Sequence, residues 1–378
     1  MKQERRTFDP SFKNKAVELS GVRGNTKQVA EELGIEAHLI YRWKKEFSMN
    51  DSNSFSIVCP VFNEKDYIDD LLIFLGKVSP SPDEIFFIDG MSTDGTRAII
   101  EKAIKKWPKI QLISNPDKLV PFALNLAIPL CTSNIIVRLD VHTKYAEDYF
   151  ARILATFEKV DADIVGGPTR TAFKSPFQEA VAHIFNTPLG MGNSSVHNVE
   201  YNGYTDSVTF GAWKKEMFEN TGLFDTRLKR NQDDEFHYRA KSMGFKIYQN
   251  SDIKLWYYPR NNWNGLFKQY FQYGLYKPVV LFKIKSALSI RHLVPSFLVL
   301  YSLSLIVISF LRPILLMPIL IYFLLILIVT LNSRSSIEAK MFIPFAFIAV
   351  HFGYGLGFIL GCFKVLNTYI YSHLFRTI

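Results

Sequence analysis

The segment Asn134-Ile-Ile-Val-Arg-Leu-Asp-Val-His142 decides the expected fold. Its apolar run predicts a buried β-strand. The strand delivers a carboxylate, Asp140, and an imidazole, His142, at its C-terminal end. Side chains two positions apart lie on the same side of an extended chain, so both can hold one divalent cation against a diphosphate. Oxygen and imidazole ligands suit Mg²⁺ or Mn²⁺, and the imidazole favours Mn²⁺ slightly.

Strands and helices alternate on both sides of this segment. The pattern predicts strands over 54–62, 84–89, 110–114, 135–141 and 163–167, and helices over 65–78, 93–107, 121–130 and 146–159. Such alternation indicates an α/β fold with a largely parallel sheet and helices on both faces. Ligands then bind at the carboxyl ends of the strands. An Asp-x-His pattern is weak evidence alone, and its place at the end of the fourth strand strengthens it.

A second acidic cluster, Gln232-Asp-Asp-Glu235, begins a predicted helix, because Phe236, Tyr238 and Arg239 follow at helical spacing. Acidic residues in a first helical turn are favoured by the helix dipole, which gives the cluster a purely structural interpretation. Its chemical interpretation is that one of its carboxylates acts as a general base. Sugar transfer from a nucleoside diphosphate needs a carboxylate that accepts the acceptor's proton and a cation that neutralises the leaving group.

A turn rich in Asp and Gly, Asp89-Gly-Met-Ser-Thr-Asp-Gly-Thr96, follows the second predicted strand. Asp89 can accept a hydrogen bond from a uracil N–H, and its glycines permit tight turns close to a nucleotide. Val61-Phe-Asn-Glu64, at the end of the first strand, would complete a pocket for base and ribose. Such turns are common in α/β proteins, so this signal is weak by itself.

Residues 1–47 form a separate predicted unit of three helices, with Gly34 at the turn between the second and third. Helix, turn and helix in this order are typical of helix-turn-helix proteins. The third helix would expose basic side chains: His38, Arg42, Lys44 and Lys45. The segment 26–43 resembles the N-terminal DNA-binding segment of insertion-sequence transposases. An ordinary three-helix cap is the alternative, and DNA binding does not follow from the resemblance. Residues 48–53 are a polar linker.

Apolar segments dominate residues 291–378. Three of them, 293–311, 313–331 and 342–363, are expected to span a membrane, because each helix would be about 28–33 Å long. The preceding segment, 261–290, is aromatic and basic and predicts an amphipathic helix in the bilayer interface. A core helix of the enzyme domain is the alternative. Overlapping Gly-x-x-x-Gly spacings at 353–361 would let another helix approach, from the same chain or another.

The composition limits the class of protein. The chain has 378 residues, 48% of them hydrophobic, and a formal net charge of +9. That charge suits nucleic acid, anionic lipid or a phosphorylated substrate and does not choose among them. Its three cysteines, Cys59, Cys131 and Cys362, lie far apart, which excludes a cysteine metal cluster and favours a reducing compartment. No secretion signal is visible, and basic residues beside the apolar segments favour a cytoplasmic enzyme domain over 54–260.

Together these residues resemble a family 2 inverting glycosyltransferase with a GT-A fold, over residues 55–276. The resemblance is closest to succinoglycan-type, ExoA-like exopolysaccharide transferases, which also carry C-terminal membrane segments. Six motifs carry it: Cys59-Pro-Val-Phe-Asn-Glu64, Asp89-Gly-Met-Ser-Thr-Asp-Gly-Thr96, Val137-Arg-Leu-Asp-Val-His142, Thr209-Phe-Gly-Ala-Trp-Lys-Lys215, Gly222-Leu-Phe-Asp225 and Asn231-Gln-Asp-Asp-Glu-Phe-His-Tyr-Arg239.

The resemblance implies roles for individual residues. The nucleotide-sugar would contact Pro60, Phe62, Asn63, Glu64, Asp89, Ser92, Asp94, Arg138 and Asp140. The acceptor region would include Asp206, Gly211, Trp213 and Arg239. Asp140 and His142 would bind the metal, and Asp233, with Asp234 as its rival, would be the base.

Two positions depart from the family pattern. His142 replaces the usual second Asp of the metal motif, and Gln232 replaces a Glu. The Arg-Trp of the signature of processive synthases is also missing near Gln269-Tyr-Phe-Gln-Tyr273.

We therefore expect a membrane-anchored transferase that uses a divalent cation, Mn²⁺ or Mg²⁺. It would add one sugar from a nucleotide donor, a UDP-sugar, to a lipid-linked saccharide in exopolysaccharide or cell-surface glycan synthesis. The expected location is the inner (plasma) membrane, multi-pass, with the catalytic domain in the cytoplasm. Two alternatives stay open: a processive polysaccharide synthase, and a DNA-binding membrane regulator whose 54–260 domain senses a sugar nucleotide.

Overall fold

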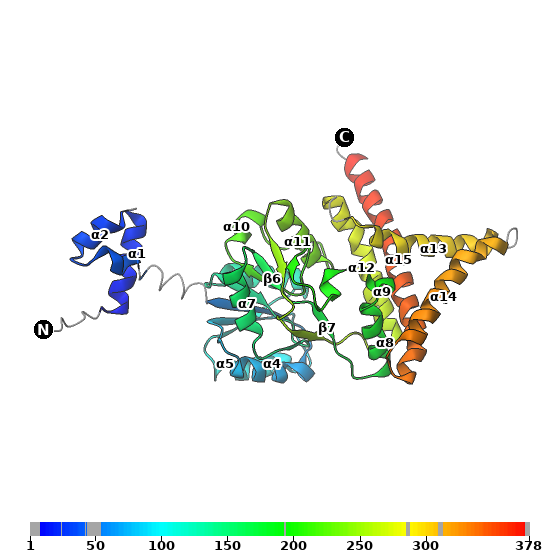
Figure 1. Ribbon diagram of the computed structural model, residues 1–378, viewed down its shortest axis with the longest axis horizontal. Coiled ribbons are helices and arrows are strands. Elements are labelled where there is room, and N and C mark those ends of the chain that lie inside the picture. The colour runs from blue at the N-terminus through cyan, green and yellow to red at the C-terminus, as the bar shows by residue number, and fades with distance from the viewer. Residues whose placement is uncertain are drawn as a thin grey trace.

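The computed structural model describes residues 8–23, 25–41, 43, 54–192, 194–284, 288–308 and 313–374. It contains a small N-terminal helical unit, a central α/β domain and a group of C-terminal helices (Figure 1). The predicted α/β class is confirmed by the central domain, whose sheets hold eight and three strands.

The N-terminal unit contains α1 (Pro10–Val22) and α2 (Thr26–Glu32), with a further helical stretch over 37–41. Asn25 caps α2 by accepting a hydrogen bond from the Gln28 N–H. The unit has its own apolar core, formed by Ala16, Val29, Ala30, Ile40 and Trp43. The predicted basic residues Arg42, Lys44 and Lys45 lie outside the described residues.

The large sheet has the strand order β3-β2-β1-β4-β9-β6-β10-β8. Its members are β1 (Phe55–Val61), β2 (Glu84–Asp89), β3 (Ile110–Ser114), β4 (Ile135–Arg138), β6 (Ile164–Gly166), β8 (Gly203–Tyr204), β9 (Ala212–Lys214) and β10 (Ile247–Gln249). The β3-β2-β1-β4 half is parallel, as predicted, whereas β9 runs antiparallel to both of its neighbours. The sheet is therefore mixed, and the carboxyl ends of β1, β2 and β4 meet at one edge.

A smaller sheet contains β5 (Lys144–Tyr145), β11 (Leu255–Tyr257) and β7 (Thr169–Thr171). Helices cover the large sheet: α4 (Lys65–Lys77), α5 (Thr96–Ile104), α6 (Val120–Ala127), α7 (Tyr149–Lys159), α10 (Met217–Thr221) and α11 (Gln232–Ser242). The predicted strands β2 and β3 match residue for residue, and the predicted helices agree within a few residues at their ends.

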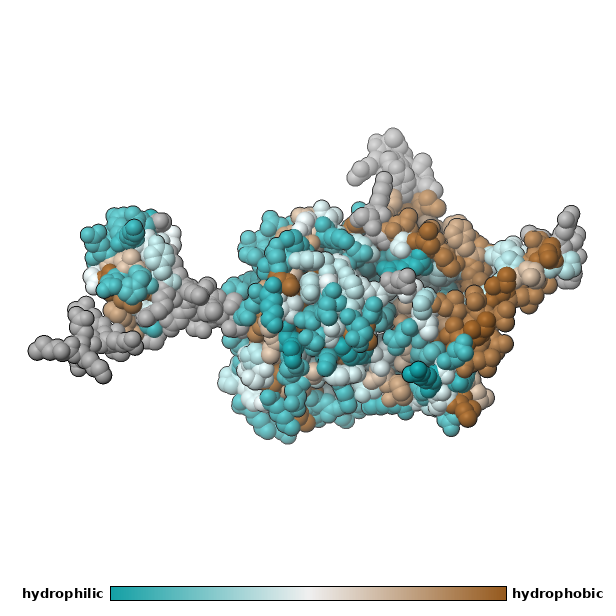
Figure 2. All heavy atoms as spheres, viewed as in Figure 1, coloured by the Kyte–Doolittle hydropathy of each residue, from teal (hydrophilic) through white to brown (hydrophobic). Residues whose placement is uncertain are grey.

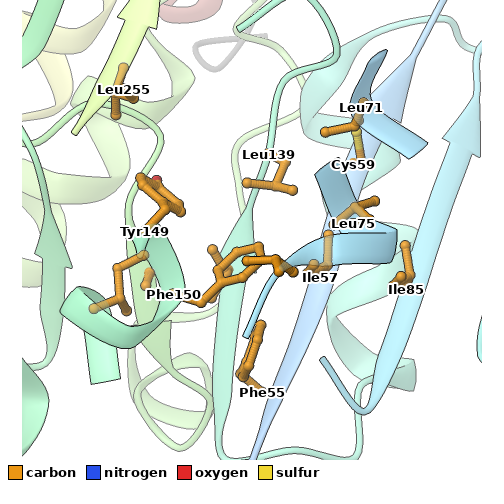
Figure 3. Close-up of a cluster of buried hydrophobic side chains, with 14 of the residues drawn as sticks. Phe55, Ile57, Cys59, Leu71, Leu75, Ile85, Leu139, Tyr149, Phe150 and Leu255 are labelled. Carbon is orange, nitrogen blue, oxygen red and sulfur yellow. The ribbon is translucent and has the colours of Figure 1, made fainter. Parts of the chain in front are cut away.

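Alternation along β1 divides the core into two layers. Ile57 and Cys59 belong to one apolar cluster, and Val58, which points to the other face, belongs to a second. Figure 3 shows Phe55, Ile57 and Cys59 beside side chains of α4 and α7, including Leu71, Leu75 and Phe150. Because both faces of β1 are buried, the ends of the central strands are fixed on both sides.

The remaining helices are α8 (Pro176–Phe185), α9 (Pro188–Met191), α12 (Trp263–Lys283), α13 (Ile290–Ile308), α14 (Met317–Asn332) and α15 (Ile337–Leu374). Gly353, Gly357 and Gly361 of α15 face α12, whereas Gly355 faces α13. A Cβ atom at Gly357 would lie 2.1 Å from the Phe271 carbonyl oxygen, and one at Gly274 would lie 2.1 Å from that of Tyr354. The Gly-x-x-x-Gly partner is therefore α12 of the same chain, which settles that alternative.

Two helical segments among the described residues are long and apolar enough to cross a membrane: Pro313–Asn332 and Ile337–Asn367. They include the predicted segments 313–331 and 342–363. The remaining predicted segment, 293–311, falls on α13. The apolar stretch of this helix, Ile290–Leu305, is shorter than the two candidate spans. Figure 2 shows apolar atoms gathered over the C-terminal helices, where α14 exposes Leu320, Leu324 and Leu331.

Candidate active site

The first group of polar residues lies where β1 and β2 end. Asp89, the last residue of β2, is fully buried, and its carboxylate accepts hydrogen bonds from the Ser92 N–H at 3.1 Å and from Arg97 Nη1 at 3.2 Å. Asn63 has a positive φ of 55° and exchanges hydrogen bonds with the turn after β2: its N–H donates to Ser92 Oγ, and its side-chain oxygen accepts from the Thr93 N–H, both at 2.9 Å. The two turns are therefore held together.

Asp94 ties the same turn to α4. Its carboxylate accepts hydrogen bonds from the N–H groups of Lys65 and Thr96, both at 3.0 Å. The hydrogen bond from the Thr96 hydroxyl, which outweighs burial, lowers the pKa of Asp94 to about 2. This carboxylate therefore stays ionised at neutral pH and serves the loop structure.

Phe62 is the exposed member of this group. Phe62 is the first residue after β1 and is 45% exposed. The Lys118 ammonium lies 5.8 Å from the centroid of its ring. Pro60 precedes it within β1, opposite Ile88. An exposed ring beside a cation offers a stacking surface for a base and a charge for a phosphate.

The second group centres on His142. Its Nδ1 lies 3.0 Å from Glu64 Oε1 and 3.0 Å from Asp140 Oδ1. Burial opposes a charged imidazole, but the hydrogen bonds to Asp140 and Glu64 outweigh it and raise the pKa of His142 to about 10. Burial would likewise raise the pKa of Asp140, but the hydrogen bond and charge of His142 and the charge of Arg138 lower it. His142 therefore links the end of β1 to the end of β4.

The third group begins α11, and it separates the two rival bases. Asp233 is 40% exposed in its side chain, and its Oδ2 lies 3.8 Å from Arg138 Nη1. Asp234 Oδ2 instead lies 2.5 Å from the Lys277 ammonium of α12, and Lys277 is only 4% exposed. Asp234 is thus engaged in a short ion pair with a buried lysine, whereas the more exposed Asp233 makes the longer contact with Arg138.

One cavity of about 820 Å³ is lined by members of the second and third groups, whereas the residues of the first group do not line it. Five of the predicted site residues line it: Arg138, Asp140, His142, Asp233 and Asp234. Its far end is lined by helix residues, which include Val294, Pro295 and Leu298 of α13, Tyr322 of α14, and His351 and Tyr354 of α15. The cavity therefore runs from charged groups at the strand ends to apolar helices, and its volume falls in the range of small-molecule sites.

The predicted acceptor residues lie at separate places in the structure. Asp206 pairs with Lys241 and lines a second cavity of about 1110 Å³. The Gly211 carbonyl accepts a hydrogen bond from the Arg138 N–H at 3.2 Å, so this glycine supports the strand that carries Arg138. Trp213 is fully buried in the core, and Arg239 donates to Glu235 and to the Leu223 carbonyl oxygen. The structure brings none of Asp206, Gly211, Trp213 and Arg239 to the lining of the cavity of about 820 Å³.

Sequence reasoning gave no role to two side chains that shape the site. Lys277 neutralises Asp234, and its signal was its place seven residues after Tyr270, on the buried face of α12. Phe210 lies under the Arg138 guanidinium, whose carbon is 5.3 Å from the ring centroid. Phe210 left no readable signal, because the contact joins two segments that are far apart in the sequence.

The metal-ligating side chains at the cavity suit a divalent cation only when a substrate supplies further ligands. The described part of the chain holds no group of three or more His, Cys, Asp or Glu side chains placed to bind a metal ion. Asp140 and His142 offer one carboxylate and one imidazole at the cavity wall. Cations that serve nucleotides commonly take one or two protein ligands and complete their shell with phosphate oxygens and water. The pair therefore fits a cation bound together with a diphosphate.

Comparison with known proteins gives matches over both parts of the chain. The family model described as "Glycosyl transferase family 2" matches residues 56–222, and the one described as "Transposase" matches residues 2–63. The chain is 30% identical over 247 residues to "Succinoglycan biosynthesis protein ExoA" of Rhizobium meliloti (strain 1021). The matched residues make up 65% of this chain and 75% of that protein.

A second relative covers more of the chain. The "Dolichyl N-acetyl-alpha-D-glucosaminyl phosphate 3-beta-D-2,3-diacetamido-2,3-dideoxy-beta-D-glucuronosyltransferase" of Methanococcus voltae is 27% identical over 329 residues, which are 84% of this chain and 99% of that protein. Among solved structures, the mannosyltransferase PcManGT from Pyrobaculum calidifontis, in complex with GDP-Man and Mn²⁺, has a TM-score of 0.56 at 17% identity, over 79% of this chain and 86% of that one. This last likeness concerns the fold alone, and it confirms the predicted GT-A architecture.

Proposed function

The chain belongs to glycosyl transferase family 2, and we propose that it transfers one sugar, with inversion, from a UDP-sugar to a lipid-linked saccharide at a membrane. One observation carries this proposal: a single cavity of about 820 Å³ connects Asp140 and Asp233 with the side chains of the C-terminal helices. Charged groups at one end suit a nucleotide-sugar, and apolar helices at the other suit a lipid.

The strand ends would bind the donor. Phe62 would offer its exposed ring to the base, and the fully buried Asp89 would hold the turn after β2 beside it. Asp140 and His142 would hold a divalent cation, which when bound supplies positive charge to the leaving diphosphate. Glu64 Oε1 lies 3.0 Å from the His142 Nδ1 atom and so would orient the imidazole ring.

Asp233 would act as the base. It faces the cavity at the start of α11, where the helix dipole favours the ionised carboxylate. The acceptor hydroxyl attacks the anomeric carbon and forms the new C–O bond, and its proton passes to Asp233. The bond from the anomeric carbon to the diphosphate oxygen breaks on the opposite side, and the electron pair leaves with the diphosphate. Attack opposite to the leaving group inverts the anomeric centre.

The lipid of the acceptor would lie at the helix end of the cavity. There α13 and α15 contribute apolar side chains such as Val294, Leu298 and Val350. Arg260 and Arg291 line the same cavity and would face a phosphate of the lipid. The name of the Methanococcus voltae relative contains a dolichyl phosphate-linked sugar, and this supports an acceptor of the same class.

We place the protein in the plasma membrane, with the catalytic domain in the cytoplasm. The two helical segments Pro313–Asn332 and Ile337–Asn367 would cross the bilayer, and α12 and α13 would lie at or near its surface. The exposed apolar side chains of α14 support this placement, because water would solvate them poorly. The transposase-like N-terminal unit takes no part in the proposed reaction.

The test is transfer by the purified protein in detergent, with a panel of nucleotide-sugars and a polyprenyl diphosphate-linked saccharide. We expect release of UDP and a product longer by one sugar, loss of both in EDTA and recovery with Mn²⁺. Removal of residues 1–48 should leave the rate unchanged. The proposal fails if no nucleotide-sugar is consumed, and products longer by many sugars would favour a processive synthase.

A further inference from the structure

The wall of the cavity of about 820 Å³, which we call the catalytic cavity, carries the hydroxyl side chains of Thr169, Ser207 and Thr209. Thr169 and Thr209 bond to each other through their Oγ1 atoms, so their hydroxyls are paired within the wall. Ser207 differs, because its Oγ lies 2.8 Å from the Nδ1 atom of His237, a buried residue of α11. The Ser207 hydroxyl is therefore held by a side chain behind the wall.

His237 is a neutral, buried imidazole with one unmet nitrogen. The residue is 1% exposed, and burial, which outweighs the charges of Asp233 and Asp234, lowers the pKa of its side chain. Its Nε2 atom is buried and has no hydrogen-bond partner among the described residues. An unmet buried polar atom is unfavourable, and an apolar side chain of the same size would avoid it. What the imidazole supplies in return is a fixed partner for the Ser207 hydroxyl.

The chain that follows Ser207 is also fixed. Val208 is buried, and a Cβ atom at Gly166 of β6 would lie 2.7 Å from the Val208 Cβ, so these two residues pack closely. The bond between Thr209 and Thr169 ties the next position to β7. Because its main chain and its side chain are both held, the Ser207 hydroxyl has one defined position at the cavity wall.

This hydroxyl keeps hydrogen-bonding capacity for a ligand. A hydroxyl has one donor and two acceptor positions, and the contact with His237 uses only one of the three. A sugar hydroxyl both donates and accepts, so it can satisfy the positions that Ser207 has left. The chemistry of this wall therefore suits a saccharide.

The place of Ser207 in the cavity indicates which sugar it meets. His237 follows the proposed base Asp233 by four positions, so both side chains lie on one face of α11, about 6 Å apart along its axis. The sugar that reaches Asp233 is the acceptor, because Asp233 takes its proton. The donor, in contrast, is held at the end of β4 by Asp140 and His142.

We propose that Ser207 binds a hydroxyl group of the acceptor sugar and that His237 is a positioning residue, which orients the Ser207 hydroxyl for this contact. The inference rests on the proposed function and names a residue that helps to select the acceptor. Ser207 and Asp233 hold two different hydroxyls of one sugar ring, and so the ring enters in one orientation. No bond forms or breaks at Ser207, and the proton of the attacking hydroxyl still passes to Asp233.

The test is the rate of transfer by the full-length protein in detergent, with the polyprenyl diphosphate-linked saccharide and the UDP-sugar varied in turn. In Ser207→Ala we expect the KM for the saccharide to rise about fivefold, because one hydrogen bond to it is lost, while the KM for the UDP-sugar is unchanged. Ser207→Thr keeps the hydroxyl and should lie closer to the wild type. Ser242→Ala, which removes an exposed hydroxyl bonded to the Arg239 carbonyl oxygen at the other end of α11, is the matched control and should behave as the wild type.

A second pair of variants tests the role of His237. His237→Asn keeps an N–H near the Nδ1 position and should raise the KM for the saccharide less than His237→Leu, which removes the partner of Ser207. When Ser207→Ala and His237→Leu are combined, the rise should equal that of Ser207→Ala alone, because both changes break the same contact. Effects that multiply in the double variant would make His237 a purely structural residue and overturn its positioning role.

Three other results would overturn the proposal. An unchanged KM for the saccharide in Ser207→Ala would remove Ser207 from acceptor binding. A rise in the KM for the UDP-sugar, with that for the saccharide unchanged, would assign Ser207 to the donor. A wild type without transfer would contradict the proposed function itself, and the inference with it. If His237→Leu does not fold, the comparison of Ser207→Ala with Ser207→Thr still decides the acceptor contact.

Discussion

The two ends of the catalytic cavity are built in different ways. At the catalytic end, Arg138, Asp140 and His142 come from five consecutive positions at the end of β4. At the helix end, the lining comes from α12, α13, α14 and α15, which span more than a hundred positions. The charged groups of the cavity are thus positioned by local geometry on a buried sheet, whereas its helix end depends on how distant helices pack.

Polar contacts connect the two ends through α12. Asn231 Nδ2 donates to the Tyr273 carbonyl oxygen at 2.9 Å, and Lys277 pairs with Asp234 at 2.5 Å. Lys283 lies 2.8 Å from Glu235, a fully buried carboxylate. The first turn of α11, which carries Asp233, is therefore held by a helix that packs in turn on α15. Changes on the α12–α15 contact should reach the catalytic carboxylate.

The largest expected effect tests the catalytic end alone. Asp233→Asn removes the proton acceptor and should lower transfer about a thousandfold, while UDP binding is retained. Asp234→Asn, the matched variant, should cost much less, because Asp234 is already occupied by Lys277. Turnover of both variants with the lipid-linked acceptor is the measurement. A greater loss in Asp234→Asn would exchange their roles.

The next effect concerns the packing of the helix end. In Gly357→Ala the added Cβ would lie 2.1 Å from the Phe271 carbonyl oxygen, so α12 and α15 must separate. We expect a loss of about 1–3 kcal/mol in the free energy of unfolding, read as a lower Tm in detergent. Gly21→Ala is the control, because a Cβ there meets nothing within 4 Å. Equal Tm values for the Gly357 variant and the wild type would contradict the close contact.

A smaller effect is expected where the two ends meet. Lys277→Met leaves Asp234 without its partner and loosens the first turn of α11. We expect kcat to fall about tenfold, with the KM for the donor unchanged, since a misplaced base affects the transition state more than donor binding. Adding Asp234→Asn should restore the stability lost in Lys277→Met, because the unpaired carboxylate is removed. A higher donor KM at constant kcat would place Lys277 in donor binding instead.

The smallest effect on folding is expected on the outer face of α14. Leu324 is exposed, so Leu324→Ser should change the free energy of unfolding in detergent by less than about 0.5 kcal/mol. The same change should reduce the partition of the protein into liposomes, because an apolar side chain that faces lipid becomes polar. Flotation of both proteins with liposomes is the measurement. A large drop in Tm would show that α14 is packed rather than exposed.

The sequence by itself determined the central strands and helices of the α/β domain. Apolar runs marked β1, β2 and β4, and the residues at or just after their ends, Asp89, Asp140 and His142, lie at the carboxyl edge of the parallel strands. The helical spacing after Gln232 marked the start of α11. The predictions of strands and helices succeeded because each depends on neighbours within a few positions, and local periodicity reports such neighbours directly.

Only the tertiary structure gave the two carboxylates, Asp233 and Asp234, different partners and gave Arg138 its surroundings. Asp234 is engaged by Lys277, 43 positions away, and His142 is held by Glu64, 78 positions away. The Gly-x-x-x-Gly residues of α15 likewise pack against α12 of the same chain rather than against another chain. Contacts of this kind leave no periodic signal, because they are fixed by the packing of whole helices and strands, and one sequence does not reveal which distant side chains that packing brings together.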